Sequence, residues 1–215
     1  MSPRNRVTLL LLVPSRAPSE WLEVLDAGER ERHARFKFEA DRQAFLAAHG
    51  LLRHALSRHV TSVAPMDWRF TTREHGKPFT TDAPGVHFNL SHCRELVVVA
   101  IGPRELGVDV EPIDPRHATD DVARRVYGPG ELPHSKGDAF FTRWALKEAW
   151  VKATGIGLHD DLPSFELEIS DDGTAKVVRG DAAQWRFRWW ARAGVRLAVC
   201  VDSAEPLEIE LKDWE

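Results

Sequence analysis

Short hydrophobic runs separated by turn residues predict a chain rich in buried strands. Residues 7–13 and 96–101 are almost continuously apolar, and residues 86–90 and 106–111 alternate apolar with polar positions. Such runs are typical of strands covered on one or both faces. Gly102-Pro103 separates the second run from the last, so we expect residues 96–111 to form an antiparallel hairpin.

The first hydrophobic run, residues 7–13, also has the outline of a secretion signal, because Arg4 and Arg6 precede it. Pro14 and Arg16 follow at once, and no small-x-small cleavage site is evident. The run is too short to span a bilayer. We therefore interpret it as a buried first strand.

Helical spacing marks three further regions. Residues 20–37 are densely charged and predict one or two exposed helices. Residues 41–60 carry an apolar stripe that includes Phe45, Leu52 and Leu56, which predicts a helix packed on a core. Residues 138–154 predict a third helix, and Gly155 follows where a C-terminal cap belongs.

A long helix followed by strands occurs in both halves of the sequence. The remaining strands are predicted at residues 68–70, 164–169, 174–178, 184–191 and 195–201. We therefore expect an α+β fold of two halves, residues 1–103 and 104–215, each of ordinary domain size.

Composition narrows the class of protein without naming a function. Of the 215 residues, 43% are hydrophobic and 29% charged, and the formal net charge is -4. Nothing in this balance points to nucleic acid or to an anionic membrane, so an anionic ligand needs a local basic patch. The two cysteines, Cys93 and Cys200, form no metal or disulfide pattern, and we expect a cytoplasmic protein.

One predicted strand carries two alternating acidic residues, Gly107-Val108-Asp109-Val110-Glu111. Residues two apart in a strand point to the same face, so Asp109 and Glu111 project together while the valines face the core. Two adjacent carboxylates repel each other, and Mg²⁺ or Mn²⁺ would relieve that repulsion. The acidic solvent face of an edge strand explains the same pattern, so the pair alone leaves both interpretations open.

The third predicted helix contains the segment Trp144-Ala145-Leu146-Lys147-Glu148-Ala149-Trp150-Val151-Lys152. Glu148 and Lys152 lie four residues apart and project from one side of a helix. A surface ion pair is the simplest explanation. Several aromatic residues nevertheless predict that this helix is largely buried, where charges need partners.

A third group of polar residues lies at the end of the predicted strand 87–92, and a lysine-containing turn precedes that strand. The strand His87-Phe88-Asn89-Leu90-Ser91-His92 ends in amide, hydroxyl and imidazole groups, and Lys77 adds a cation within Gly76-Lys77-Pro78. Phosphates bind such groups. The spacing of a Walker loop is absent, and a histidine at a strand end is often structural.

Basic residues cluster before and at the start of the helix at 41–60, and a solvated helix face is their default interpretation. They are Arg30, Arg32, Arg35, Lys37 and Arg42.

Together and in this order, the motifs resemble the Sfp-type 4'-phosphopantetheinyl transferases. The family pattern is a GKP turn, a strand ending F-N-x-S-H, a G-[VI]-D-[VI]-E strand and a W-x-x-K-E-[AS]-x-x-K helix. This chain matches it at residues 76–78, 88–92, 107–111 and 144–152, and residues 36–42 resemble the family's entry into its N-terminal helix. The resemblance thins after about residue 160.

The resemblance implies two similar α/β halves related by a pseudo-twofold axis, with the active site at their interface. It implies that Asp109, Glu111 and Glu148 hold Mg²⁺ together with the diphosphate of coenzyme A. It implies that Lys152 contacts the diphosphate. It also implies that the nucleotide end and its 3'-phosphate are held by Arg42, Lys77, Ser91 and His92. Glu29 stands where a cation is expected, so the N-terminal phosphate contacts stay open.

The implied reaction moves the phosphopantetheine arm of coenzyme A to a serine of an apo acyl or peptidyl carrier protein and releases 3',5'-ADP. We expect Asp109, Glu148 and Lys152 to be catalytic: Lys152 would assist the leaving oxygen, and Glu148, directly or through a water, would accept the serine proton. The carrier could belong to fatty acid, polyketide and other secondary metabolite, nonribosomal peptide or lysine pathways.

The oligomeric state, the surface that docks the carrier protein and two alternative functions stay open from sequence. We expect a monomer, and a basic surface that includes Arg53 and Arg58 is a candidate for docking an acidic carrier. A magnesium-dependent phosphohydrolase acting on a nucleotide diphosphate would use the same carboxylates and lysine. A catalytically silent module that binds carrier proteins is the other alternative, although an intact acidic and basic set speaks against it.

Overall fold

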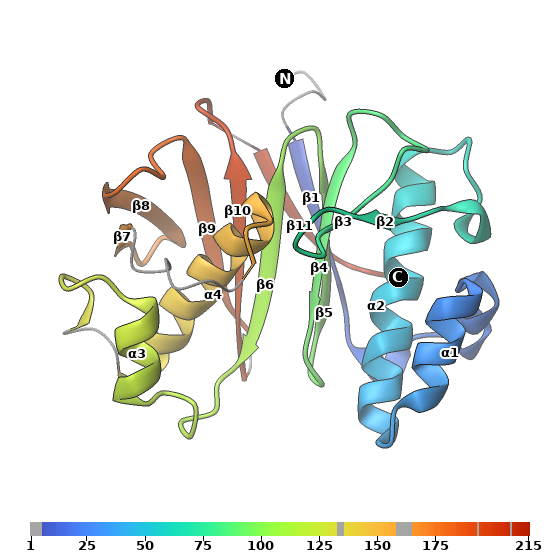
Figure 1. Ribbon diagram of the computed structural model, residues 1–215, viewed down its shortest axis with the longest axis horizontal. Helices are drawn as coiled ribbons and strands as arrows, with labels where there is room; N and C mark the ends of the chain where they lie inside the picture. The colour runs from blue at the N-terminus through green and yellow to red at the C-terminus, as the bar shows by residue number, and fades with distance from the viewer. Residues whose placement is uncertain (1–5, 133–135, 158–164, 193, 207) are drawn as a thin grey trace.

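Two large sheets, each covered by one long helix, form the body of the molecule, and two short strands form a small two-stranded sheet beside them (Figure 1). The computed structural model describes residues 6–132, 136–157, 165–192, 194–206 and 208–215. The strands are β1 (Arg6–Leu12), β2 (Thr71–Thr72), β3 (Pro78–Phe79), β4 (His87–His92), β5 (Val97–Gly102), β6 (Leu106–Pro112), β7 (Glu166–Ile169), β8 (Thr174–Arg179), β9 (Trp185–Arg192), β10 (Val195–Asp202) and β11 (Glu208–Asp213). The helices are the 3-10 helices η2 (Pro14–Arg16), η3 (Ser19–Val24) and η4 (Pro65–Asp67) and the α-helices α1 (Ala27–Arg35), α2 (Glu39–His59), α3 (Asp120–Val126) and α4 (Asp138–Thr154).

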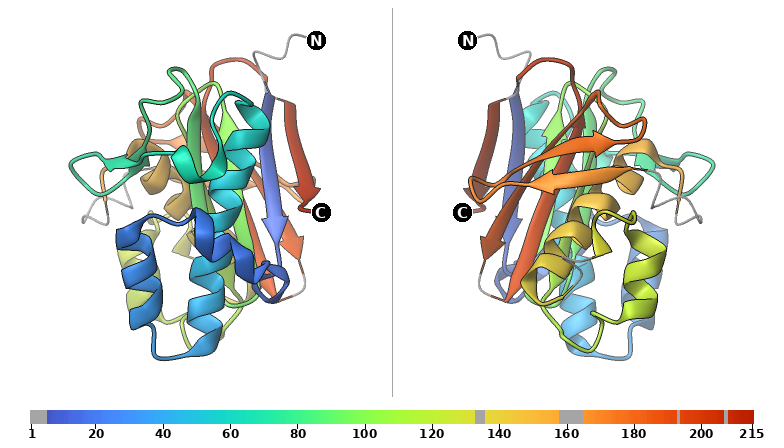
Figure 2. Two further views of the ribbon diagram at one scale, coloured as in Figure 1. Left: turned by 90° about the vertical axis from the view of Figure 1, so that its right-hand side faces the viewer. Right: turned by 90° about the vertical axis from the view of Figure 1, so that its left-hand side faces the viewer.

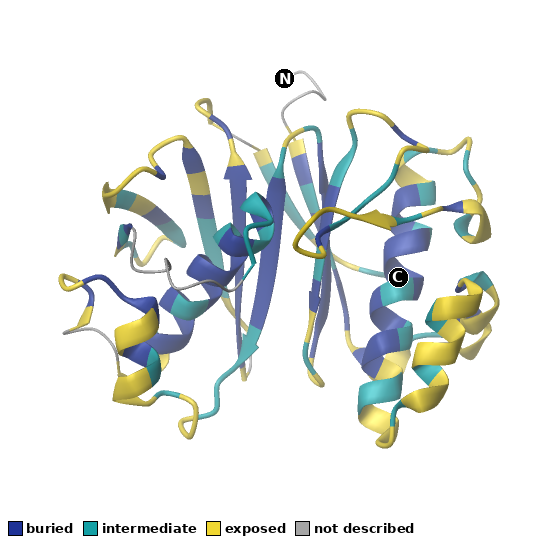
Figure 3. Ribbon diagram, viewed as in Figure 1, coloured by how far each residue is buried: buried dark blue, intermediate teal, exposed yellow. Residues whose placement is uncertain are grey.

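The first sheet has the strand order β11-β1-β5-β4, and α2 covers one of its faces. The apolar stripe of α2, which includes Ala48, Leu52 and Leu56, packs against Phe88 and Val99 of the sheet. The two ends of α2 and most of α1 stay exposed, as Figure 3 shows in yellow. The expected helices at residues 41–60 and within 20–37 are confirmed.

The second sheet has the order β6-β10-β9-β8-β7, and α4 lies across β6 and β10. Ala145, Leu146 and Ala149 of α4 pack against Phe187 and Cys200. The helix ends as its sequence predicts, since Gly155 adopts φ 70° and donates its N–H to the carbonyl of Val151.

The two sheets also pack against each other through the faces that their helices leave uncovered. Val7 and Leu9 of β1 and Val98 of β5 share one core with Val108 of β6 and Leu197 of β10. β5 is therefore buried along its whole length. The first hydrophobic run is confirmed as a buried strand, and among the described residues no helix is long and apolar enough to cross a membrane.

The chain follows the same path twice. In the first half β1 leads to α2 and then to β4 and β5, which lie in the order β1-β5-β4. In the second half β6 leads to α4 and then to β9 and β10, which lie in the order β6-β10-β9. All of these neighbours pair antiparallel. The α+β fold of two similar halves is thus confirmed.

The last strand returns to the first half. β11 pairs in parallel with β1, from Arg6 beside Glu208 to Leu11 beside Asp213. Both views of Figure 2 show the blue β1 and the red β11 running side by side. Residues near the C-terminus thus complete the sheet built by residues near the N-terminus.

The expected hairpin at residues 96–111 is wrong. β5 already has β1 on one edge and β4 on the other, while β6 pairs with β10 in the second sheet. The turn between them carries the chain from one sheet to the other. A local pattern of strand, turn and strand cannot separate these outcomes, because both strands are buried in either case.

The strand expected at residues 68–70 is also wrong, because pairing begins only with β2. Trp68 is 2% exposed, and its Nε1 donates to Ser57 Oγ at 2.8 Å. This residue therefore anchors the segment on α2 as a buried side chain rather than as part of a sheet.

The glycine that opens the acidic strand lets α4 rest directly on β6. A Cβ at Gly107 would lie 2.1 Å from the carbonyl oxygen of Ala149 and 2.3 Å from the amide nitrogen of Ala153. Both contacts are with helix backbone, which cannot rotate away as a side chain can. Gly107 therefore sets the separation of β6 and α4, the elements that carry the acidic pair and the Glu148–Lys152 pair.

Gly107→Ala should lower the free energy of unfolding by about 3 kcal/mol, because overpacking forces the helix off the strand. Urea denaturation measures this change. Gly28→Ala is the matched control: its Cβ would lie 3.4 Å from Asp26 Oδ1 in the exposed helix α1, so its effect should stay within about 1 kcal/mol. Equal stabilities of the two variants would contradict the close approach.

Candidate active site

Side chains of β4 bind the open edge of β6 and so join the two halves. β6 is an edge strand, and β10 pairs with only one of its sides. On the other side, the amide of Val108 donates to Asn89 Oδ1 at 3.0 Å and the amide of Val110 donates to Ser91 Oγ at 3.3 Å. These buried amides would otherwise lack partners, at a cost of about 1–3 kcal/mol each. The Asn-x-Ser spacing of the F-N-x-S-H strand thus matches the two-residue period of β6.

The same junction brings a cation and a carboxylate together. Lys152 Nζ of α4 lies 2.5 Å from Asp109 Oδ1 of β6 and donates to Ser91 Oγ of β4 at 2.8 Å. Ser91 Oγ in turn donates to Asp109 Oδ1 at 3.0 Å. Asp109 is 2% exposed, so its charge is compensated by Lys152 and by the serine hydroxyl. Three elements from both halves meet at this point.

Two further carboxylates lie beside this cluster and are hard to ionise. Burial raises the pKa of Glu111 to about 8, the negative charge of Asp109 adds to the rise, and a hydrogen bond from Trp144 Nε1 at 3.0 Å opposes it. Burial likewise raises the pKa of Glu148 to about 7, again with a contribution from Asp109. Three acidic groups thus compete for the positive charge of one lysine.

These acidic groups have the chemistry that a divalent cation requires. Asp109 Oδ2 and Glu148 Oε1 are buried and accept no hydrogen bond from the described residues. Unfilled carboxylate oxygens are ligands that Mg²⁺ or Mn²⁺ prefers. Within the described parts of the chain, however, no three such side chains converge on one point, because Lys152 holds Asp109 and Trp144 holds Glu111. The donor set fits a cation, although the side chains are not gathered around one.

The first lysine of the W-x-x-K-E helix faces away from this cluster. Lys147 is fully buried; its Nζ lies 2.6 Å from Glu131 Oε2 and donates to the carbonyl of Phe165 at 2.8 Å. Glu131 also accepts from the amides of Gly128 and Leu167. Lys147 and Glu131 therefore tie α4 to β7. The sequence offered no signal for Glu131, because its partners are scattered along the chain.

Lys77 of the GKP turn lies at the same junction of halves but already has partners. Its Nζ donates to Glu105 Oε2 at 2.7 Å and to the carbonyls of Leu106 and Ala153 at 3.2 and 2.6 Å. All three N–H donors of the ammonium are thus used. A ligand contact through this group would require one of these hydrogen bonds to be given up.

A cavity of about 330 Å³ opens between the halves next to the lysine and carboxylate cluster. Lys77 and Asn89 line it from the first half, and Glu148, Lys152 and Gly155 line it from the second. Glu111 faces a different cavity, of about 300 Å³, which Phe140 and Trp144 also line. The acidic cluster therefore lies between two openings.

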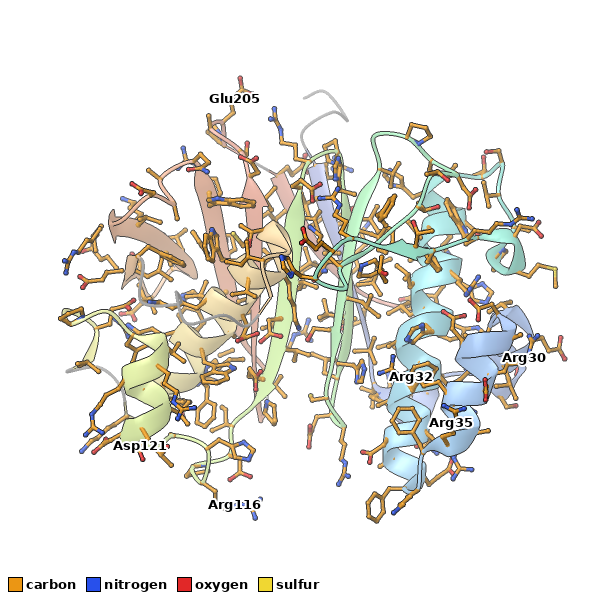
Figure 4. The ribbon with its side chains drawn as sticks, viewed as in Figure 1. Arg30, Arg32, Arg35, Arg116, Asp121 and Glu205 are labelled. Carbon is orange, nitrogen blue, oxygen red and sulfur yellow. The ribbon has the colours of Figure 1, made fainter. Side chains whose placement is uncertain are left out.

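Positive groups gather near Lys152 on the side of α1 and α2. The pKa of His92, the exposed end of β4, lies below its ordinary value because surrounding protein desolvates the imidazole and because His49, Lys152 and Arg32 add positive charge. Figure 4 places Arg32 on the side of α1 nearer to the second half and Arg30 on the far side. This grouping is electrostatically unfavourable without an anion.

Arg42 is engaged at the junction of α1 and α2. Its Nη2 donates to the carbonyl of Phe36 at 3.2 Å, and its Nε lies 3.5 Å from Glu39 Oε2.

Of the predicted site residues, the structure brings Ser91, Asp109 and Lys152 into direct contact. Glu111, Glu148 and His92 are their neighbours, whereas Arg42 and Lys77 contact other groups.

Glu29, which stands where a cation was expected, has a structural use. It closes the capping box of α1 with Asp26 and lies 2.7 Å from the buried guanidinium of Arg53. Burial alone would raise the pKa of Glu29, but hydrogen bonds from His49 and from the Asp26 amide, with the charge of Arg53, lower it to about 2. Arg53 is fully buried, so its proposed part in a docking surface is wrong.

Comparison with known proteins gives matches along most of the chain. A family model described as the 4'-phosphopantetheinyl transferase superfamily matches residues 105–200, and one described as 4'-phosphopantetheinyl transferase, N-terminal, matches residues 14–104. A 4'-phosphopantetheinyl transferase of Bacillus subtilis is 30% identical over 204 residues, which is 90% of this chain and 90% of the relative.

Two further relatives carry similar names. The 4'-phosphopantetheinyl transferase Sfp of Bacillus subtilis is 27% identical over 91% of this chain and 90% of its own length. The 4'-phosphopantetheinyl transferase HetI of a Nostoc species is 33% identical over 74% of this chain and 70% of its own length.

The raised pKa of Glu148 predicts a stability difference that grows with pH in metal-free buffer. The unfolded carboxyl titrates near 4.5 and the folded one near 7. The folded state therefore holds the extra proton between these values and loses stability as the pH rises through them. Glu148→Gln, which carries no charge, should match the wild type below pH 4.5 and exceed its unfolding free energy by about 3 kcal/mol at pH 8.

Denaturant unfolding of both proteins across this pH range measures the difference. Titrating groups away from the cluster cancel between the two proteins, whereas loss of the Glu148 charge also lowers the pKa of Glu111 and so adds to the difference in the same direction. A difference that does not change with pH would show that Glu148 ionises as readily in the folded protein as in the unfolded chain.

Proposed function

Because this chain belongs to the Sfp-type 4'-phosphopantetheinyl transferase family, we propose that it transfers the 4'-phosphopantetheine arm of coenzyme A to a serine of an apo acyl or peptidyl carrier protein. The reaction releases 3',5'-ADP. The observation that carries the proposal is the contact of Ser91, Asp109 and Lys152, because it joins a cation to buried acidic groups at a cavity between the halves.

The phosphates of coenzyme A would bind on the basic side of this junction. Lys152 would contact the diphosphate, and His92 and Ser91 would contact the nucleotide end. The lowered pKa of His92 has desolvation as its main cause and the charges of Lys152 and Arg32 as further causes, and their proximity supports this arrangement because an anion would offset those charges. Arg42 and Lys77 remain predicted contacts of the 3'-phosphate region, and both have protein partners in this structure.

Asp109, Glu111 and Glu148 are the residues that would hold Mg²⁺ or Mn²⁺. A bound cation would neutralise charge on the diphosphate and lower the cost of placing three carboxylates together. The raised pKa values of Glu111 and Glu148 and the two unfilled carboxylate oxygens support this assignment.

Proton transfer requires one acceptor and one donor. The carrier serine oxygen attacks the β-phosphorus of coenzyme A, forming a new phosphoester bond as the bond to the 3',5'-ADP oxygen breaks. Glu148 is the proposed base, because its Oε1 has no hydrogen-bond partner among the described residues and its pKa lies near 7. Lys152 is the proposed donor toward the leaving oxygen. Every group named here belongs to one chain, so a monomer would contain the complete site.

Mass spectrometry of an intact apo carrier protein, incubated with this protein, coenzyme A and Mg²⁺, tests the transfer. The carrier should gain the mass of one phosphopantetheine arm, and chelator or Asp109→Ala should abolish the gain. A carrier that stays unmodified while coenzyme A binds would favour a silent binding module. Release of inorganic phosphate without any acceptor would favour a phosphohydrolase.

Glu148→Gln should separate chemistry from binding. Without the proton acceptor, turnover should fall at least 100-fold, while calorimetry should show coenzyme A binding within about fivefold of the wild type. Glu205→Gln, which changes an exposed carboxylate at the upper end of the molecule in Figure 4, should leave both unchanged. Near-normal turnover of Glu148→Gln would rule out its role as the base.

A further inference from the structure

A further cavity, of about 650 Å³, lies in the second half and is separate from the acidic cluster. The first turns of α4 line it on one side, and β7, β9 and β10 line it on others. Glu148 and Lys152 belong to the later turns of α4 and line the cavity between the halves instead. None of the residues assigned to coenzyme A or to the metal lines the larger cavity.

Arg143 brings a largely buried guanidinium to this cavity. The residue is 8% exposed, and its buried Nε has no hydrogen-bond partner among the residues that the structure describes. Its Nε lies 3.9 Å from Glu131 Oε1, which is too far for a hydrogen bond. Glu131 in turn is already satisfied by Lys147 and by two backbone amides. Within the described chain, the Nε–H of Arg143 therefore lacks a hydrogen-bond acceptor, and Glu131 pairs with its charge only at a distance.

Arg196 of β10 adds a second guanidinium to the same cavity. It is also 8% exposed; it donates to the carbonyl of Val195 and to Asp138 Oδ2, and its Nε has no partner. Burying a guanidinium without its hydrogen bonds is costly, and a bound oxyanion would recover that cost. Two buried N–H donors without partners, the Nε–H groups of Arg143 and Arg196, therefore lie at one cavity.

The rest of the lining limits which anion fits. Leu167, Ile169 and Trp189 supply apolar surface, and Trp189 is held by a hydrogen bond from its Nε1 to the carbonyl of Ser170. Three exposed carboxylates also line the cavity, those of Asp138, Glu168 and Asp171, and the first is paired with Arg196. They would repel a multiply charged anion more than a singly charged one.

We propose that this cavity binds a small organic carboxylate, with the carboxylate on Arg143 and Arg196 and the apolar body against Trp189. A planar guanidinium matches a carboxylate through paired hydrogen bonds. Because the cavity shares no lining residue with the proposed coenzyme A site, both ligands can be bound at once.

Titration with benzoate at constant ionic strength tests the site in the full chain. The indole N–H signal of Trp189 in a ¹H–¹⁵N spectrum, assigned from Trp189→Phe, should shift and saturate. Arg143→Met should weaken binding at least tenfold. Arg125→Met is the matched control, because it removes an exposed arginine of α3 that does not line the cavity, and it should bind as the wild type does.

Two analogues test the chemistry of the ligand. Benzyl alcohol, which lacks the charge, should produce no saturable shift, and dianionic phenyl phosphate should bind more weakly than benzoate. Equal binding of benzyl alcohol would overturn anion recognition, and tighter binding of phenyl phosphate would overturn the assignment to a carboxylate. Absence of any shift with benzoate would overturn the site itself.

The remaining indole signals and the melting temperature report whether each variant is folded. If Arg143→Met does not fold, Arg143→Lys keeps the charge but loses the paired donors, and it should weaken benzoate binding severalfold; unchanged binding would contradict the proposal. Saturating coenzyme A should leave the Trp189 shift in place. No turnover is measured, so the outcome is independent of the proposed transferase activity.

Discussion

The hydrogen bonds from β6 amides to Asn89 and Ser91 are the constraint on which the rest of the molecule depends. Two sheets that merely pack through valine and leucine side chains could slide along each other, because apolar contacts are not directional. The amides of Val108 and Val110 have one position each at which a β4 side chain can accept their protons. The junction therefore fixes the register of the two halves and, with it, the meeting of Ser91, Asp109 and Lys152.

The charged groups at this junction lower the stability of the folded protein, because they are buried and only partly compensated. Asp109, Glu111 and Glu148 are largely removed from water, and Lys152 and Trp144 compensate only part of their charge. The raised pKa values of the two glutamates express that cost. Such an arrangement is expected at a site whose ligands supply the missing charge: cations for the carboxylates, and phosphates for the basic groups near His92.

Helix α4 carries different chemistry on different sides, which is why it shows no simple amphipathic pattern. Glu148 and Lys152 face the junction of the halves, Lys147 is buried against Glu131 and Phe165, and Arg143 lines a separate cavity. A helix covered on most sides must satisfy each charge locally. Lys147, Glu148 and Lys152 stand within one short motif, yet they serve two different purposes: one holds the helix in place and the others form the proposed site.

The helices, most of the strands and the pairing of residues within one element can be predicted from the amino-acid sequence alone. Asp109 and Glu111 share a side because strands alternate, and Glu148 and Lys152 share a side because a helix turns every 3.6 residues. The order of the strands in the sheets, the pairing of Glu29 with Arg53, and the partners of Lys77 and Lys147 follow from the packing of distant segments and could not be predicted from the sequence. Periodicity is set by the local backbone and can be read along the chain. Contacts between distant segments depend on how two sheets and two helices pack together, and no local pattern encodes that arrangement.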